Sequence, residues 1–242
     1  MIEATYVDHM GSDLSVVNAA RVSFGKKSEY KTLTKCYDTG EVISKELSLR
    51  DAKLINYLAK HKHLSPFGHA FASFHVKAPI FVARQLVKHK FLRWNEISRR
   101  YVDDEPEFYT PDVWRGRSAD KKQGSEGVVT HLDVGWGSSE CCPPDGSILH
   151  PLEDWVQGFN INAFEDYTVL VKSGVAPEQA RMVLPQSTMT EWYWSGSLDA
   201  FADMCRLRCK EDTQYESRVV ADQISEMMGG LFPVSWTALL HD

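Results

Sequence analysis

Cysteines are few in this 242-residue sequence, and their spacing excludes the usual disulfide and zinc frameworks. There are five, at positions 36, 141, 142, 205 and 209, and no CxxC pair recurs as a zinc site would need. An odd and scattered set is typical of reduced thiols in a cytosolic protein. Cys205 and Cys209 are four residues apart in an expected helix, where small thiols are commonly buried.

Long apolar runs and the common nucleotide motifs are missing as well. No run approaches the length that spans a membrane, and no cationic stretch followed by an apolar core marks a signal peptide. The absence of GxGxxG argues against a Rossmann dinucleotide site, and the absence of GxxxxGKS or GxxxxGKT argues against a P-loop. Without a GxSxG elbow, the sequence offers no support for a hydrolase of that class.

The nine histidines do not form a recognisable metal site. No HExxH pair is present, and the HxH of His61-Lys62-His63 has no carboxylate at ligand spacing. A lysine between two candidate ligands also repels a dication. We therefore expect no bound metal.

The length of the chain suits a single catalytic domain over residues 1–242, and its charge argues against a protein that coats DNA or RNA. The formal charge is −6, whereas proteins that coat DNA or RNA are normally basic. Within this domain, residues 110–150 are rich in Gly, Ser, Pro, Asp and Lys, so we expect a loop insertion there.

Hydrophobic periodicity predicts an α+β fold rich in helices. Strands are expected at residues 2–7, 71–76 and 188–194, with a polar loop at 26–45. Helices are expected at 14–21, 49–61, 79–90, 152–172 and 198–210, with a short one from Pro177 that Pro185 ends. A capping box at Thr213 and Glu216 would start a last helix, which Gly229-Gly230 would end.

One segment of this acidic chain gathers cations, polar groups and aromatics: Lys88-His89-Lys90-Phe91-Leu92-Arg93-Trp94-Asn95-Glu96-Ile97-Ser98-Arg99-Arg100-Tyr101. Lysine offers a point charge and arginine a two-pronged donor, so the segment favours a phosphate-bearing ligand. Ser98 has basic neighbours, but the sequence identifies no positioned base that would make it a nucleophile. The residues alone predict a phosphorylated ligand held by a cationic, hydrogen-bonding loop.

Two further arginine positions stand out. Arg181 lies among apolar neighbours at 180 and 182–184, which suggests that it is buried. Arg206 and Arg208 lie near the end of an expected helix. The ordinary alternative for all three is a surface or helix-terminal arginine beside a carboxylate.

Several motifs, in order along the chain, resemble the flavin-dependent thymidylate synthases, the ThyX family. Residues 88–101 resemble the family signature RHRxxSxNExSxRY, with Lys88, Lys90 and Arg93 as departures from it. His63-Leu64-Ser65-Pro66-Phe67-Gly68-His69 resembles the family's His-x-Thr/Ser-Pro-Phe-x-His turn. Residues 74–85, 180–185, 207–208 and 214–216 resemble the family segments at the same places in the chain.

The resemblance implies a methyltransferase that converts dUMP to dTMP on helices packed against a central, twisted, mostly antiparallel sheet. Methylenetetrahydrofolate would donate the carbon, FADH2 the hydride, and NADPH would reduce the FAD. The protein would be a cytoplasmic homotetramer of a bacterium, or of a virus in its host, with active sites shared between subunits. It would have no nucleic-acid or membrane partner.

The resemblance also implies roles for individual residues. Those that bind dUMP would be Gln85, Lys88, Glu96, Ser98, Arg99, Arg100, Arg181 and Arg208. Those that bind FAD would be His63, Ser65, Lys88, His89, Lys90, Glu96, Ser197 and Asp203. Positions 68, 197, 199 and 203 hold residues that differ from those that many relatives have there.

Arg208 would be the catalytic residue under this resemblance. A guanidinium that stays charged favours uracil ionised at N3 and so makes C5 nucleophilic, without an enzyme nucleophile. The alternative from another class is a non-catalytic protein that binds nucleotides or single-stranded nucleic acid through residues 88–100. An oxidoreductase acting on another pyrimidine is a further alternative.

Overall fold

A four-stranded sheet lies at the centre of the computed structural model, which describes residues 1–35, 42–101, 105–120, 124–135 and 147–241. Its strands run in the order β1 (Glu3–Met10), β4 (Phe71–Pro79), β10 (Met189–Ser197) and β5 (Leu92–Glu96). Every neighbouring pair is antiparallel. The expected α+β class and antiparallel sheet are therefore confirmed.

Side chains alternate between the two faces of this sheet. On β4, Ala72, Phe74 and Val76 are buried, whereas the residues between them are half-buried. Trp192 and Trp194 continue the buried face on β10. A strand with period-two alternation buries one face and leaves the other toward solvent, so the helices pack on the buried face.

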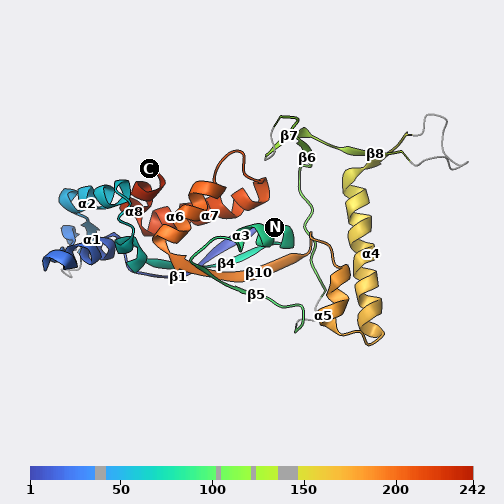
Figure 1. Cartoon of the computed structure of the whole chain (residues 1–242), viewed down its shortest axis with the longest axis horizontal. Helices are drawn as coiled ribbons and strands as arrows, with labels where there is room; N and C mark the ends of the chain where they lie inside the picture. The colour runs from blue at the N-terminus through green and yellow to red at the C-terminus, as the bar shows by residue number, and fades with distance from the viewer. Residues whose placement is uncertain (36–41, 102–104, 121–123, 136–146, 242) are drawn as a thin grey trace, which may run out of the picture.

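Helices cover one face of the sheet and both of its ends (Figure 1). They are α1 (Asp13–Arg21), α2 (Leu49–Lys60), α3 (Ile80–Leu86), α4 (Leu152–Lys172), α5 (Pro177–Ala180), α6 (Leu198–Arg208), α7 (Tyr215–Leu231) and α8 (Pro233–Leu240). Short 3-10 turns are η1 (Val22–Phe24), η2 (Ser65–His69) and η3 (Arg181–Val183). α6 and α7 lie over the sheet, α1, α2 and α8 gather at one end, and α4 and α5 lie at the other. None of the helices in the described ranges is long and apolar enough to cross a membrane.

The core lies between the sheet and the helices above it. Phe201 of α6 packs edge-on against Phe74 and Trp194, with ring centroids 5.2 and 5.6 Å apart. Ile224 and Met228 of α7 are fully buried in the same cluster. Aromatic edge-to-face packing fixes α6 over β4 and β10, and so fixes where α6 ends.

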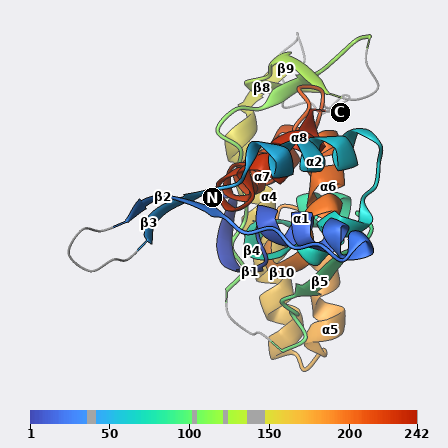
Figure 2. The same ribbon diagram turned by 90° about the vertical axis from the view of Figure 1, so that its left-hand side faces the viewer.

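Two expected loops contain strands. The segment expected as a loop at 26–45 forms a pair of β2 (Lys31–Lys35) and β3 (Val42–Glu46), which extends from the body in Figure 2. The expected insertion at 110–150 forms the pairs β6 (Arg115–Arg117) with β7 (Ser125–Val128), and β8 (His131–Gly135) with β9 (Ser147–Pro151). These short polar strands are held together by backbone hydrogen bonds. Their sequences therefore carry no alternating hydrophobic pattern, which is why their composition indicated loops.

The expected boundaries of two helices are wrong. The helix expected at 79–90 ends at Leu86, and β5 begins at Leu92, inside the cationic segment. At α7 no side chain caps the first turn; Thr213 Oγ1 instead donates to the Leu207 carbonyl, 3.0 Å away. α7 also runs through the two glycines to Leu231, after which Pro233 starts α8. Tertiary packing overrides the local capping and glycine signals here.

Cys205 is a buried free thiol, as the helical spacing predicted, and Cys209 is half-buried. Burial raises the pKa of the Cys205 thiol well above its usual value, so it stays protonated. Positions 36, 141 and 142 lie outside the described residues.

Candidate active site

β5 carries the centre of the cationic segment and is fixed by aromatic stacking. The Trp94 ring stacks on Trp192 of β10 with centroids 4.2 Å apart and planes at 17°. Glu96 ends the strand, and its carboxylate accepts hydrogen bonds from Thr190 Oγ1 (2.7 Å) and Trp94 Nε1 (3.0 Å). Two donors to an otherwise exposed carboxylate hold it in one orientation, which suits a ligand-binding role.

Arg208 and His89 come from distant parts of the chain and meet at the end of α6. Arg208 Nε donates to His89 Nε2 over 2.9 Å. Burial first and the Arg208 charge second lower the pKa of His89 to about 4, against a smaller opposing effect of Asp203. His89 is therefore neutral at neutral pH, with its Nε2 lone pair free to accept and its proton on Nδ1. Burial also lowers the pKa of Arg208, but a guanidinium remains charged at neutral pH.

Arg208 lines a cavity of about 310 Å³ together with Gln85 of α3. The Gln85 Oε1 atom is buried and has no hydrogen-bond partner within the described ranges. A buried acceptor without a donor is costly, so this amide is suited to receive an N–H from a ligand. Two residues expected to bind dUMP thus line one cavity. Arg208 provides a permanent positive charge, and Gln85 provides an amide oxygen without a hydrogen-bond donor in the described ranges.

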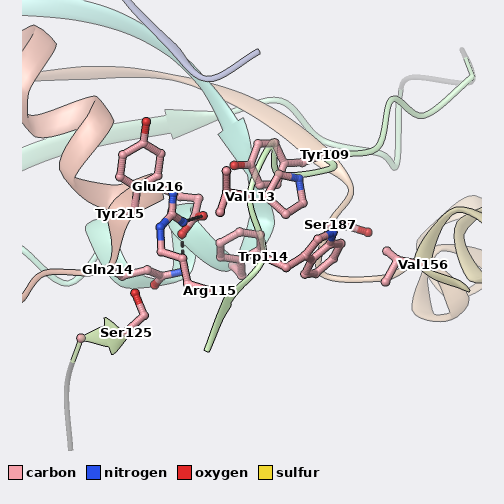
Figure 3. A pocket seen from close by; sticks show the side chains of 13 residues that line it. Tyr109, Val113, Trp114, Arg115, Ser125, Val156, Ser187, Gln214, Tyr215 and Glu216 are labelled. Carbon is pink, nitrogen blue, oxygen red and sulfur yellow. Dashed lines mark hydrogen bonds and ion pairs between the residues drawn. The ribbon is translucent and has the colours of Figure 1, made fainter. Parts of the chain in front are cut away.

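A second cavity of about 370 Å³ adjoins this one, and Gly124 and Gln214 line both. Arg115 Nη1 lies 3.0 Å from Glu216 Oε1, and the Arg115 guanidinium sits 3.8 Å above the Tyr215 ring (Figure 3). The close-up also draws Tyr109 and Trp114 on the wall of this cavity. Burial raises the pKa of Tyr109 to about 12, so its hydroxyl stays protonated.

His63 and Ser65 line a third and larger cavity of about 810 Å³, between α1, α2 and η2. Lys26, Arg50 and Lys53 add positive charge to its wall. The ring of Tyr57, which also lines it, stacks on His61 at 4.0 Å. Cofactor pockets are typically about 300–1,000 Å³, so the size suits a dinucleotide. Cations suit its pyrophosphate and a flat ring suits a base, so these residues fit FAD.

The other residues of the cationic segment that were expected to bind ligands lie on either side of β5, in the turns before and after this strand. Ser98 Oγ accepts from the Arg100 backbone N–H (3.4 Å) and from Arg100 Nε (3.3 Å). A hydroxyl that faces a guanidinium is placed to bind an anion, whereas a nucleophile needs a base. Lys88 and Lys90 are exposed, and Arg99 is half-buried. Phe91, which follows Lys90, has a φ of 63° and so holds the turn in a conformation that costs energy for a bulky residue.

Arg181 is exposed, so the burial expected from its apolar neighbours is wrong. Met182 next to it is 78% exposed, Val183 and Leu184 are half-buried, and Ala180 is the one fully buried neighbour among these four. Arg181 Nε donates to the Glu178 carbonyl over 3.3 Å, within the turn of α5 and η3. α5 lies beside α4, away from α6 in both views, so one chain does not bring this turn to the Arg208 cavity (Figures 1 and 2).

Two more residues expected at the flavin are Asp203 in α6 and Ser197, the last residue of β10. Asp203 forms an ion pair with Arg206 one turn along the helix. Ser197 is the N-cap residue of α6, although its side chain makes no capping hydrogen bond. The adjacent Asp199 has a buried Oδ1 without a partner in the described ranges.

Sequence reasoning missed several residues that shape the site. Thr190 holds Glu96, Gln214 lines both adjoining cavities, and Arg115 lines the second one, where it pairs with Glu216. Gln214 lies in a segment that resembles the family, which was a signal for it. Thr190 and Arg115 carried no local signal, because their roles depend on contacts across the fold.

The fold and the cavities together define an α+β protein whose cavity walls carry cations and amides, the groups that suit an anionic ligand. Comparison with known proteins agrees: residues 5–234 match the family model of the thymidylate synthase complementing protein, and the chain belongs to this family. A flavin-dependent thymidylate synthase of Thermus thermophilus is 38% identical over 232 residues, which are 96% of this chain and 73% of the relative.

Two further comparisons extend the similarity to nearly the whole chain. A flavin-dependent thymidylate synthase of Kosmotoga olearia is 37% identical over 97% of this chain and 88% of its own length. A crystal structure of the UMP/dUMP methylase PolB from Streptomyces cacaoi, bound with 5-Br dUMP, superposes with a TM-score of 0.72 at 30% identity. That match covers 98% of this chain and 94% of PolB. The fold of this chain is therefore that of an experimentally solved pyrimidine nucleotide methylase.

Proposed function

We propose that this protein is a flavin-dependent thymidylate synthase that methylates C5 of dUMP to give dTMP. Its carbon donor is methylenetetrahydrofolate, its flavin is FAD, and NADPH is the reductant. The observation that carries the proposal is the shared cavity of Arg208 and Gln85, with Arg208 held by a neutral His89. The names of its relatives and the brominated dUMP bound to PolB support the same substrate.

The residues of the Arg208 cavity act on the uracil ring. The Gln85 Oε1 atom lacks a donor and accepts a hydrogen bond from the ligand. The Arg208 guanidinium stabilises negative charge at N3, which increases electron density at C5. Because His89 is neutral, it orients Arg208 without cancelling its charge. C5 then needs no enzyme nucleophile, and Ser98, held by Arg100, contributes to substrate binding.

The proposed FAD-binding residues are His63 and Ser65 on the large cavity, Lys88, His89, Lys90 and Glu96 of the cationic segment, and Ser197 and Asp203. When bound, the reduced flavin supplies the hydride that completes the methyl group. Arg50 and Lys53 on the same cavity offset the charge of the pyrophosphate. The chain acts as one catalytic domain, residues 1–242.

The active protein is a homotetramer whose sites are shared between subunits. This assembly accounts for Arg181, which is exposed and remote from the Arg208 cavity within one chain. Within the described part of the chain, Arg181 Nε donates to one backbone carbonyl, which leaves the rest of the exposed guanidinium to bind a phosphate at a neighbouring subunit's site.

The test is to purify the protein and follow its visible spectrum and its reaction together. A flavin absorbance that NADPH bleaches anaerobically and dUMP perturbs is expected, with dTMP formed only when methylenetetrahydrofolate is added. A colourless protein that takes up no FAD and binds single-stranded nucleic acid would contradict the proposal and support the non-catalytic alternative.

A further inference from the structure

We propose that Arg115, at the start of β6, is a positioning residue for the dUMP site, and this inference rests on the proposed function. Arg115 does not line the Arg208 cavity itself. It acts through Glu216 on Gln214, which lines that cavity. The family resemblance gives Arg115 no role, and it lies where the sequence indicated only a loop.

The chain of contacts is short and continuous. Arg115 Nη1 binds Glu216 Oε1 at 3.0 Å, and the other carboxylate oxygen of Glu216 accepts from Gln214 Nε2 at 3.3 Å. Both oxygens of one carboxylate are thereby used, one toward each partner. The guanidinium plane also rests on Tyr215 at 3.8 Å, so Arg115 contacts two consecutive residues at the start of α7.

Burial makes this contact matter more than a surface ion pair. The side chains of Arg115 and Glu216 are 27% and 10% exposed, so water screens the pair weakly. If Arg115 is removed, Glu216 keeps a buried charge, and the Gln214 amide is its remaining side-chain donor among the described residues, so the carboxylate turns or draws in water. Either change moves the Gln214 side chain from its place on the wall between the two cavities.

The position of Gln214 connects this displacement to the substrate. Gln214 ends the connection that begins after Arg208, and it precedes the first residue of α7. Gln85 also lines the Arg208 cavity. Displacing Gln214 therefore alters the space that dUMP occupies without touching Arg208 or His89. Substrate affinity should fall while the chemical step is largely kept.

The experiment compares Arg115→Ala, Arg115→Lys, Gln214→Ala and the double variant Arg115→Ala/Gln214→Ala in the full-length flavoprotein. Arg117→Ala is the matched control, since Arg117 lies two residues on in β6 and is exposed. KM for dUMP, kcat, the dissociation constant of dUMP by calorimetry, the flavin spectrum and the melting temperature are measured for each.

Arg115→Ala is expected to raise the KM and the dissociation constant for dUMP about tenfold, with kcat changed by less than about threefold. Arg115→Lys should recover part of the loss, because lysine keeps the charge but not the planar contact with Tyr215. In the Gln214→Ala background, Arg115→Ala should change dUMP affinity by less than about twofold, since its effect passes through Gln214.

The proposal would be overturned if the losses of dUMP affinity in the two single variants multiplied in the double variant, or if Arg117→Ala lost as much dUMP affinity as Arg115→Ala. If Arg115→Ala does not fold, Arg115→Lys, Gln214→Ala and the double variant Arg115→Lys/Gln214→Ala carry the same test through their dUMP affinities and their non-additivity. Absence of turnover in the unaltered protein would instead contradict the proposed function, because dUMP affinity is measured separately from catalysis.

Discussion

Arg208 Nε lies 2.9 Å from His89 Nε2, which joins two residues 119 positions apart in the sequence. Two other arginines in this part of the fold are matched by carboxylates: Arg115 by Glu216, and Arg206 by Asp203. Arg208 instead contacts a neutral imidazole, so its orientation is fixed while its charge remains available to the cavity. A cation held in this way is suited to stabilise an anion that forms during reaction.

Replacing Arg208 should therefore affect the reaction far more than cofactor binding. Arg208→Ala is expected to lower kcat for dTMP formation by about 10²–10³-fold, as removal of one preorganised donor to a developing anion does. FAD should stay bound, because His63 and Ser65 lie on a different cavity, whereas the loss of the Arg208 contact with His89 should change only the position of the flavin band. Steady-state kinetics and absorbance spectra check this, with Arg117→Ala as the control. Near-normal turnover in Arg208→Ala would contradict the role given to it.

His89 should titrate far below an ordinary histidine. Its pKa is lowered from 6.5 to about 4 by burial first and by Arg208 second, so NMR of the histidine ring should show a neutral imidazole at pH 6. Arg208→Met should raise this pKa, because the repulsion from the cation is removed while much of the burial is kept. An apparent pKa near 6.5 in the unaltered protein would contradict the geometry.

The same shift predicts how stability depends on pH. Between pH 6.5 and about 4 the unfolded chain binds a proton at His89 that the folded protein does not. The unfolded state is favoured as pH falls through this window, so the contribution of His89 to stability is present above pH 6.5 and is lost toward pH 4. His89→Gln, compared in thermal unfolding at pH 7 and pH 5, should lose less stability on acidification than the unaltered protein.

Local patterns predicted the elements that local physics determines. The 21-residue helix α4 was expected at 152–172 and lies there. A long amphipathic repeat followed by a glycine predicts a helix without any knowledge of the rest of the fold. β5 was missed because its residues are mostly polar or charged. Its stability comes from pairing with β10, about 100 positions later in the chain.

Only those site residues that lie in a recognisable family motif could be predicted from the sequence. Arg208 and Gln85 were selected by resemblance, and one cavity holds both. Arg181 was expected to be buried because apolar neighbours were assumed to share its face, yet Met182 faces solvent. Thr190 and Arg115 could not be found, because a threonine in a strand and an arginine in a polar segment acquire roles only through contacts with Glu96 and Glu216.

Thr190→Val should weaken dUMP binding through Glu96. The substitution keeps the shape of the side chain but removes the hydroxyl that donates to Glu96 Oε1 at 2.7 Å. A hydrogen bond to a charged group contributes about 1.5–3 kcal/mol, so KM for dUMP should rise roughly tenfold. Ser195→Ala is the control, since Ser195 lies on the same strand and bonds Ser73 instead. An unchanged KM in Thr190→Val would show that Glu96 is held well enough without it.

Gly196 sets how closely β5 approaches β10. It pairs with Leu92, and a methyl group at Gly196 would lie 3.1 Å from the Phe91 carbonyl oxygen and closer still to the Leu92 side chain. Gly196→Ala must therefore push away the start of the strand that ends at Glu96. We expect a loss of about 1–3 kcal/mol in the free energy of unfolding, from overpacking.

Gly158→Ala is the matched control for this substitution. Gly158 lies in α4, and a methyl group there meets nothing within 4 Å. Alanine in a helix interior should raise stability by about 0.5–1 kcal/mol. Thermal unfolding of both variants, with dUMP titrations of each, checks the pair of predictions. Because β5 carries Glu96, Gly196→Ala should also weaken dUMP binding, whereas Gly158→Ala should leave it unchanged. Equal melting temperatures for the two variants would show that β5 yields to the methyl group at no cost.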